Sequence, residues 1–369
     1  MPVKPLPSNP SLDHLRHQAK DLLKGLAAHR SDVAQRLREF HPRFREATDA
    51  QLFAASLRLS DAQFAIARER GFPSWPSLKA FVETPALASR MSLPHHERID
   101  DGDFRRAVDL LDAGDANSLR ALLKQNPDLA RRRVAFPGGN YFQNPALLEF
   151  VAENPVRHGT LPGNIVEVAQ VILDAHPEAS AVDETLGLVS TGRVPRESRA
   201  QVPLIELLCG HGADPNRALQ PAASHGEFAA VCALIHRGAR MTLPVAAALG
   251  DLEEFRRLLP VSTADERHGA LALAAQFGHA EIVRLLLEAG EDPNRYNPPG
   301  FHSHSTPLHQ AALAGHDKVV RLLVERNARL DLKDTIWQGV PAGWAEHGGH
   351  PGLAAYLRAQ ETAKARTNE

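Results

Sequence analysis

The stretch STPLHQAALAGHDKVVRLLVERNARLD, from Ser305 to Asp331, predicts two short helices that lie against each other. Thr306 precedes the first helix, where its hydroxyl can accept a hydrogen bond from a free helix N–H group. Pro307 suits the first helical turn, since that position has no hydrogen bond to lose. Gly315 separates the two helices, and the second helix carries a stripe of valine and leucine. The stretch therefore predicts a helical hairpin with an apolar face suited to stacking.

The same pattern recurs upstream of this hairpin. Its nearest copy is HGALALAAQFGHAEIVRLLLEAGEDPN, at 268–294, and less regular copies begin at Gln220 and Leu243. Glycines mark the turns, and successive ones lie 24, 28, 37 and 34 residues apart: Gly226, Gly250, Gly278, Gly315 and Gly349. The mean spacing of about 31 residues indicates a repeat architecture in which each unit stacks on the next.

The repeat resembles the ankyrin-repeat family, whose consensus runs approximately TPLHxAAxxGHxxxVxxLLxxGADPN. TPLHQAALAGH at 306–316 matches the start of this consensus, while GADPN at 212–216 and GEDPN at 290–294 match its closing loop. The resemblance covers approximately residues 101–358 and is strongest from 202 onward. It implies an all-α fold, an ankyrin-repeat solenoid of about seven degenerate helix-turn-helix repeats.

Residues 1–86 lack the repeat pattern and are predicted to form a small N-terminal helical domain. Leucine and alanine recur three and four residues apart at 12–23, which is typical of an amphipathic helix beginning after Ser11. Two further helices are expected at 61–72 and 74–83, separated by a glycine and a proline. The segment also resembles an N-terminal module of bacterial ankyrin-repeat proteins, a likeness that assigns it no function.

The remaining boundaries follow from composition. A proline-containing stretch without periodicity predicts a linker at 87–100, followed by the ankyrin-repeat domain at 101–360 and a tail at 361–369. Within the repeat domain, the region 135–199 carries long insertions between its helices. Such insertions depart from a regular solenoid, so this region is a candidate for a pocket.

Composition narrows the functional classes. The 42 Lys and Arg residues nearly balance the 44 Asp and Glu residues, so no strong overall field favours nucleic acid or an anionic membrane surface. No run approaches the ~20 apolar residues of a membrane span, and the N-terminus lacks the apolar core of a signal peptide. Cys209 and Cys232 are too few for a disulfide framework and are expected to be buried, unreactive thiols. We therefore expect a cytoplasmic protein without nucleic-acid or membrane partners.

Histidines are concentrated between Phe301 and His316, and the resemblance accounts for two of the four. It implies that His309, at the TPLH position, hydrogen-bonds within and between neighbouring loops, and that His316 has a structural role after the turn glycine. The consensus does not require His302 or His304, which lie in a segment that lengthens its repeat by about four residues. These two histidines are therefore candidates for function.

In the family register, hairpin loops and first-helix positions line the inner surface of the solenoid. Apolar residues dominate these positions, which favours partner binding unless other segments cover them. Trp337 is the preferred contact because hairpin tips project outward, whereas Trp344 suits a capping role as well as ligand contact. The predicted partner- or ligand-binding residues are His302, His304, Gln310, Leu313, Trp337, Trp344, Phe277 and Gln276, with Val245 and Leu273 expected on the same surface.

A metal site is the less favoured interpretation of these histidines. In an extended segment His302 and His304 project to the same side, and His347 from the next unit could approach them to complete a three-histidine set. Nothing in the sequence identifies groups that would orient such ligands. No metal and no other cofactor is therefore predicted.

The common catalytic motifs are absent from the sequence, which has no GxSxG, GxxxxGK[ST] or HExxH and no GxGxxG after a predicted strand. We therefore predict a binding protein rather than an enzyme. The favoured function is a cytosolic scaffold or adaptor that binds a macromolecular partner, most simply a protein, on the concave surface of the repeats. The alternative is an enzyme or a small-molecule- or metal-binding protein, with a pocket formed by the insertions and the FHSHS loop at 301–305.

Overall fold

The structure is a computed structural model that describes residues 6, 11–83, 95–135, 142, 144–154 and 156–367. Across these residues the secondary structure is helical, with no strand and one isolated bridge between Arg133 and Ala146. The chain divides into two compact units, Met1–Ala181 and Val182–Glu369. No helix in the described ranges is long and apolar enough to cross a membrane. The all-α class predicted from the sequence is confirmed.

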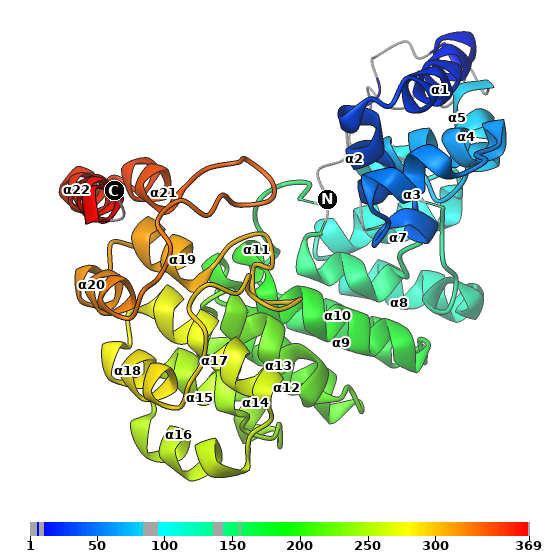
Figure 1. The fold of residues 1–369 in the computed structure, drawn as a ribbon. Coiled ribbons are helices and arrows are strands. Elements are labelled where there is room, and N and C mark those ends of the chain that lie inside the picture. Colours follow the sequence, from blue (N-terminus) through cyan, green and yellow to red (C-terminus); the bar gives the residue numbers. More distant parts are fainter. Residues whose placement is uncertain are drawn as a thin grey trace. The chain divides into compact units, whose positions relative to one another are not determined.

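The first unit begins with a group of short helices (Figure 1), and their buried side chains form an apolar core of their own. Ser11 accepts a hydrogen bond from the N–H of His14, so the first helix begins at the predicted position. The two further helices expected from the sequence are also present as α4 and α5, whereas α2 and α3 were not anticipated. The elements are α1 (Leu12–Ala27), α2 (Ser31–Phe40), η1 (Pro42–Phe44), α3 (Asp49–Ala54), α4 (Leu59–Glu69) and α5 (Trp75–Glu83).

The rest of the first unit contains the less regular repeats. Most of the predicted linker, residues 87–94, lies outside the described residues, as does most of the insertion at 136–143. A short helix, η4, contacts both α7 and α9, where a regular repeat would have an α-helix. The elements are η2 (His95–Arg98), α7 (Gly102–Asp112), α8 (Ala116–Gln125), η3 (Pro127–Ala130), η4 (Leu147–Ala152) and α9 (Ile165–Leu173).

The second unit is a stack of helical hairpins (Figure 1). The first helices of successive hairpins, α13, α15, α17, α19 and α21, pack on one another in order. The last helix reaches Thr367, into the residues predicted to be a tail. The elements are α10 (Ala179–Thr191), α11 (Arg193–Glu197), α12 (Gln201–Gly210), α13 (Pro215–Ser224), α14 (Phe228–His236), α15 (Leu243–Leu249), α16 (Leu252–Leu258), η5 (Leu259–Val261), α17 (Ala264–Phe277), α18 (Ala280–Glu288), α19 (Pro307–Leu313), α20 (Asp317–Glu325), α21 (Pro341–His347) and α22 (Pro351–Thr367).

Side chains of the closing loops join neighbouring hairpins. The Oδ1 of Asn294 accepts a hydrogen bond of 2.7 Å from the N–H of Arg329, and Asn216 makes the equivalent bond of 2.8 Å with Arg240. These asparagines end the GEDPN and GADPN segments. The bonds explain why the closing loop keeps its composition in hairpins that are otherwise dissimilar.

The two histidines expected to be structural are hydrogen-bonded between hairpins. Nε2 of His309 donates to the carbonyl of Gly339 at 3.2 Å, and Nε2 of His316 donates to the carbonyl of Gln276 at 2.9 Å. Both structural interpretations are therefore confirmed. The Thr306 hydroxyl, at the N-cap of α19, also bonds Nδ1 of His309 at 2.8 Å.

Alanine substitutions at two turn glycines would show how much the contact of His316 contributes to the stability of the stacked hairpins. Gly278 has φ +81°, and a Cβ at this position would lie 2.6 Å from Nδ1 of His316. Gly290 has φ +91°, but a Cβ there would meet nothing within 4 Å. Alanine at either position should strain the left-handed backbone by about 1–2 kcal/mol. Gly278→Ala should lower the free energy of unfolding by about 1 kcal/mol more, because His316 must also give up its hydrogen bond.

Urea unfolding of the two variants measures this difference, and Gly290→Ala serves as the control for backbone strain alone. Equal losses in the two variants would show that the contact of His316 with the turn contributes nothing to stability.

Candidate functional site

Six of the predicted binding residues line one cavity of about 690 Å³ in the second unit. The loop that precedes α19, α19 itself, the loop between α20 and α21, and α21 contribute its walls. We call it the aromatic cavity, and its lining residues are His302, His304, Gln310, Leu313, Trp337, Gly339, Gly343, Trp344 and His347.

Asp334 holds the loop that carries Trp337. Its side chain is fully buried, and its Oδ1 accepts hydrogen bonds from the backbone N–H groups of Ile336 at 2.9 Å and Trp337 at 2.6 Å. Its Oδ2 accepts from the N–H of Gly339 at 2.7 Å and from the indole N–H of Trp344 at 3.0 Å. Burial alone would raise the pKa of Asp334, but these N–H donors together lower it, so the carboxylate is ionised at neutral pH.

Three aromatic rings form a continuous wall of the cavity. The ring centroids of His304 and Trp337 lie 5.2 Å apart, and those of His304 and Trp344 lie 5.7 Å apart. The two indole rings are 5.8 Å apart at an angle of 63°. Trp344 is 8% exposed, whereas Trp337 is 68% exposed. The indole of Trp344 is therefore buried in the core, whereas the indole of Trp337 is exposed to solvent.

The two histidines not required by the consensus both face this cavity. Burial lowers the pKa of His302, and the nearby His304 and His225 lower it further, against a hydrogen bond to the Ser224 backbone. Burial also lowers the pKa of His304, although Asp334 opposes this effect. Both rings are therefore mostly neutral at pH 7.

The rim of the cavity holds two residues in a sparsely populated conformation. His302 has φ +61° and Gln338 has φ +59°, both in the left-handed region that non-glycine residues seldom adopt. Such conformations cost of order 1 kcal/mol each and persist where surrounding contacts impose them. The rim is thus held in shape by the hairpins around it.

Four residues expected on the same surface do not join the cavity. Gln276 donates its amide N–H to the carbonyl of Ser224 at 2.9 Å, and Phe277 packs edge-on against Phe228 with centroids 5.0 Å apart. Val245 and Leu273 are fully buried, which contradicts their predicted surface position. The helices that carry these two side chains, α15 and α17, pack against each other, so the consensus register did not identify exposed positions here.

The three-histidine metal interpretation is not supported. Within the described residues no group of three or more His, Cys, Asp or Glu side chains is placed to hold a metal ion. His302, His304 and His347 line the same cavity but do not converge as ligands. The expectation of two buried thiols is also wrong, since Cys232 is exposed on α14 and Cys209 is only half-buried.

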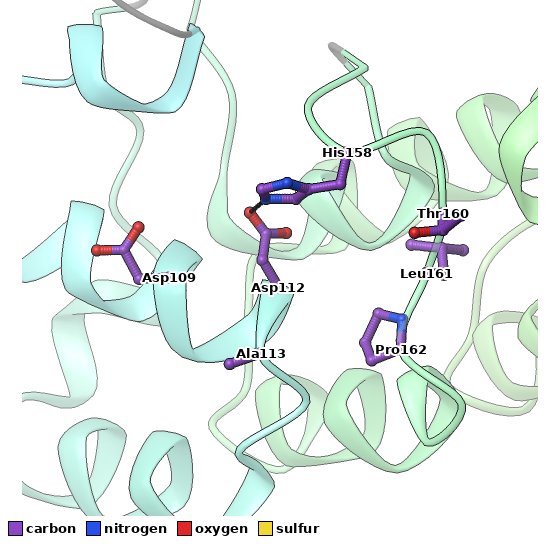
Figure 2. Close-up of a pocket in the computed structure, with 7 residues that line it drawn as sticks. All are labelled: Asp109, Asp112, Ala113, His158, Thr160, Leu161 and Pro162. Atoms are coloured by element: carbon purple, nitrogen blue, oxygen red, sulfur yellow. Dashed lines mark hydrogen bonds and ion pairs between the residues drawn. The ribbon is translucent and has the colours of Figure 1, made fainter.

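A second cavity, of about 450 Å³, lies in the first unit. Part of its wall comes from the irregular region 135–199, which was a candidate for a pocket. Figure 2 shows Asp109 and Asp112 projecting from one helix, with the carboxylate of Asp112 pointing toward the loop that carries His158. Nε2 of His158 donates a hydrogen bond of 3.3 Å to Asp112, whose carboxylate is also held by Arg157. We call it the Asp112 cavity, and its lining residues are Asp109, Asp112, Ala113, His158, Thr160, Leu161 and Pro162.

Sequence reasoning missed the role of Asp334. The signal was present in DTIWQG at 334–339, because an aspartate side chain commonly binds backbone N–H groups two and three residues later in a turn. It also missed the Asp112 cavity, whose two sides are separated by a helix and an insertion in the sequence.

Comparison with known proteins identifies similar chains. The family model for ankyrin repeats, in three copies, matches residues 243–334. Human cyclin-dependent kinase inhibitor 2A is 36% identical over 121 residues, which are 32% of this chain and 75% of that protein. Rat cyclin-dependent kinase 4 inhibitor B is 34% identical over 126 residues, covering 33% of this chain and 94% of the relative. Mouse ankyrin repeat and SAM domain-containing protein 6 is 29% identical over 106 residues, covering 29% of this chain and 12% of that protein.

Proposed function

The chain belongs to the ankyrin-repeat family, and on this basis we propose that it is a cytosolic adaptor that binds a macromolecular partner on the concave surface of its repeats. A protein is the partner that the family relationship favours. Two of the relatives are named as inhibitors of cyclin-dependent kinases, and so are named for an effect on another protein.

The observation that carries this proposal is the exposure of Trp337 beside a preformed cavity. Trp337 is 68% exposed, so its indole offers a large apolar area that a partner can bury. Ile336, next to it, is 37% exposed, so the loop tip presents two adjacent apolar side chains. Tryptophan is also one of the residue types enriched at the energetic centres of interfaces. We therefore place the contact at the loop 334–339 and the aromatic cavity.

Replacing Trp337 with alanine is expected to weaken a complex with the partner by at least tenfold while leaving folding unchanged. Loss of a tryptophan at the centre of an interface typically costs 2 kcal/mol or more of binding free energy, at about 1.4 kcal/mol for each factor of ten. Stability should change by no more than about 0.5 kcal/mol because the side chain is mostly exposed. Native mass spectrometry of the chain isolated gently from its own cells measures the complex, and urea unfolding measures the stability.

A matched control is Arg321→Ala on α20, where the guanidinium pairs with Asp317 at 2.7 Å on the helix surface. This change should leave the complex intact. A protein-sized mass that survives in the Trp337→Ala variant would contradict the proposed surface, and the absence of any protein-sized mass from the wild-type chain would contradict the adaptor function.

The size of the aromatic cavity favours a second candidate, a small-molecule-binding protein. Ligand pockets typically enclose about 300–1,000 Å³ with mostly apolar walls and a few polar groups, and this cavity of about 690 Å³ fits that description. In the same mass spectra, a discrete excess of a few hundred daltons instead of a protein mass would favour this candidate.

A further inference from the structure

Resting on the proposed function, we infer that the aromatic cavity receives a cationic side chain of the protein partner, an alkylammonium or guanidinium group of lysine, methylated lysine or arginine.

The ring geometry suits a cation. Indole has the strongest attraction for a cation among the aromatic side chains, and the attraction operates within about 6 Å of the ring centroid. The centroids of His304, Trp337 and Trp344 lie 5.2–5.8 Å from one another. A cation seated over this wall can therefore lie within about 6 Å of all three rings at once.

The charges point the same way. Among the described residues that line the cavity there is no lysine or arginine, and of its ionisable lining residues, which are histidines, His302 and His304 are mostly neutral at pH 7. The carboxylate of Asp334 lies directly behind the wall, since it accepts the indole N–H of Trp344 and the backbone N–H of Trp337. Its charge is fixed in a buried site, where electrostatic interactions are screened less than in water. An anionic partner group would instead be repelled by this charge.

The rigidity of the wall favours selection of a shape as well as a charge. Trp344 is held by its bond to Asp334, and the backbone N–H of Thr335 donates to the carbonyl of His304 at 2.8 Å. The loop with Trp337 is thereby bonded to the loop with His304. A preformed wall loses little conformational entropy when the ligand binds.

The test compares a cationic probe with its neutral isostere. The cationic probe is Nα-acetyl-Nε-trimethyl-lysine N-methylamide, and the neutral probe carries a carbon atom in place of the quaternary nitrogen. Binding to the full ¹⁵N-labelled chain is followed through the indole N–H signals of Trp75, Trp337 and Trp344. We expect saturable shifts for the last two signals, no shift for Trp75, and an affinity for the cationic probe at least about fivefold higher than for the neutral one.

Two variants then distinguish the contribution of the Trp337 indole from that of general hydrophobic contact. Trp337→Leu keeps an apolar side chain at an exposed position, where folding is not at risk, but removes the indole face, so the preference for the cation should fall. Phe277→Leu changes an aromatic residue outside the cavity and should leave the preference unchanged. Equal affinity for both probes, the absence of a saturable shift, or a preference that survives Trp337→Leu would each overturn the inference.

The outcomes also separate this inference from the proposed function. A protein complex that requires Trp337, combined with equal affinity for the two probes, would remove the cationic ligand and leave the adaptor function standing. A preference for the cation without any protein complex would remove the adaptor function and leave a cavity that binds cations. Tetramethylammonium chloride binding more tightly than the lysine probe would assign the cavity to a free small cation and overturn the side-chain assignment.

Discussion

Asp334→Ala is expected to lower the free energy of unfolding around α19 and α21 by about 3–5 kcal/mol. The substitution leaves the N–H groups of Ile336, Trp337 and Gly339 and the indole N–H of Trp344 without their acceptor. A hydrogen bond to a charged group contributes about 1.5–3 kcal/mol, and part of the loss should be recovered when water enters the space left by the carboxylate. Native-state hydrogen exchange of the two helices measures the local loss.

The control for Asp334 lies three residues earlier in the same loop. Asp331 pairs with Arg329 at 2.7 Å, but its side chain is 57% exposed. Asp331→Ala should therefore have little effect, because exposed ion pairs contribute little to stability. If both substitutions reduced protection equally, the loop would not depend on the buried carboxylate. Because the loop carries Trp337, Asp334→Ala should also abolish partner binding, while Asp331→Ala should preserve it.

Arg157→Met is expected to lower the local stability of the first unit by about 3–5 kcal/mol. The Arg157 side chain is fully buried, and it donates to Asp112 at 2.7 and 2.9 Å and to the carbonyl of Phe150 at 2.9 Å. Glu153, which is 1% exposed, lies 3.9 Å from the same guanidinium. Removing the cation leaves the buried Glu153 without a counter-charge and Asp112 with only the half-exposed His158 beside it, and breaking a buried ion pair in this way is strongly destabilising.

Hydrogen exchange of α7 and η4 measures this loss. Arg120→Met is the matched control in the same unit, because Arg120 is 53% exposed and lies 4.0 Å from Glu167, and it should leave exchange nearly unchanged. The double substitution Arg157→Met with Asp112→Leu should recover much of the stability, since Glu153 keeps its bonds from the backbone N–H groups of Arg157 and His158. A double variant as unstable as Arg157→Met would show that packing, not charge, causes the loss.

The repeat architecture was predictable because it depends on local patterns that occur several times. The proline at the start of α19, the turn glycines and the apolar stripe of α20 each act within one hairpin, and their repetition made the interpretation secure. The roles of His309 and His316 followed from the same repetition.

The irregular part of the chain was less predictable because its local patterns are not repeated. In the first unit, η4 replaces a regular first helix, and no repeated signal indicates this change. The number of repeats, about seven, and the domain boundaries at 86, 100 and 360 remain predictions. The burial of Val245 and Leu273 was missed because a consensus position specifies a helix face, whereas burial depends on how closely the next helix packs.

The residue types of the candidate site could be read from the sequence, but their arrangement could not. His302 and His304 stood out because the family pattern does not explain them, and Trp337 because it lies at a hairpin tip. That they enclose one cavity with Trp344 depends on two loops from neighbouring hairpins and on the buried Asp334, which bonds four N–H groups and sets the shape of the second loop. Local periodicity encodes helices and turns, whereas a cavity arises from contacts between segments about thirty residues apart, and no local pattern records such contacts.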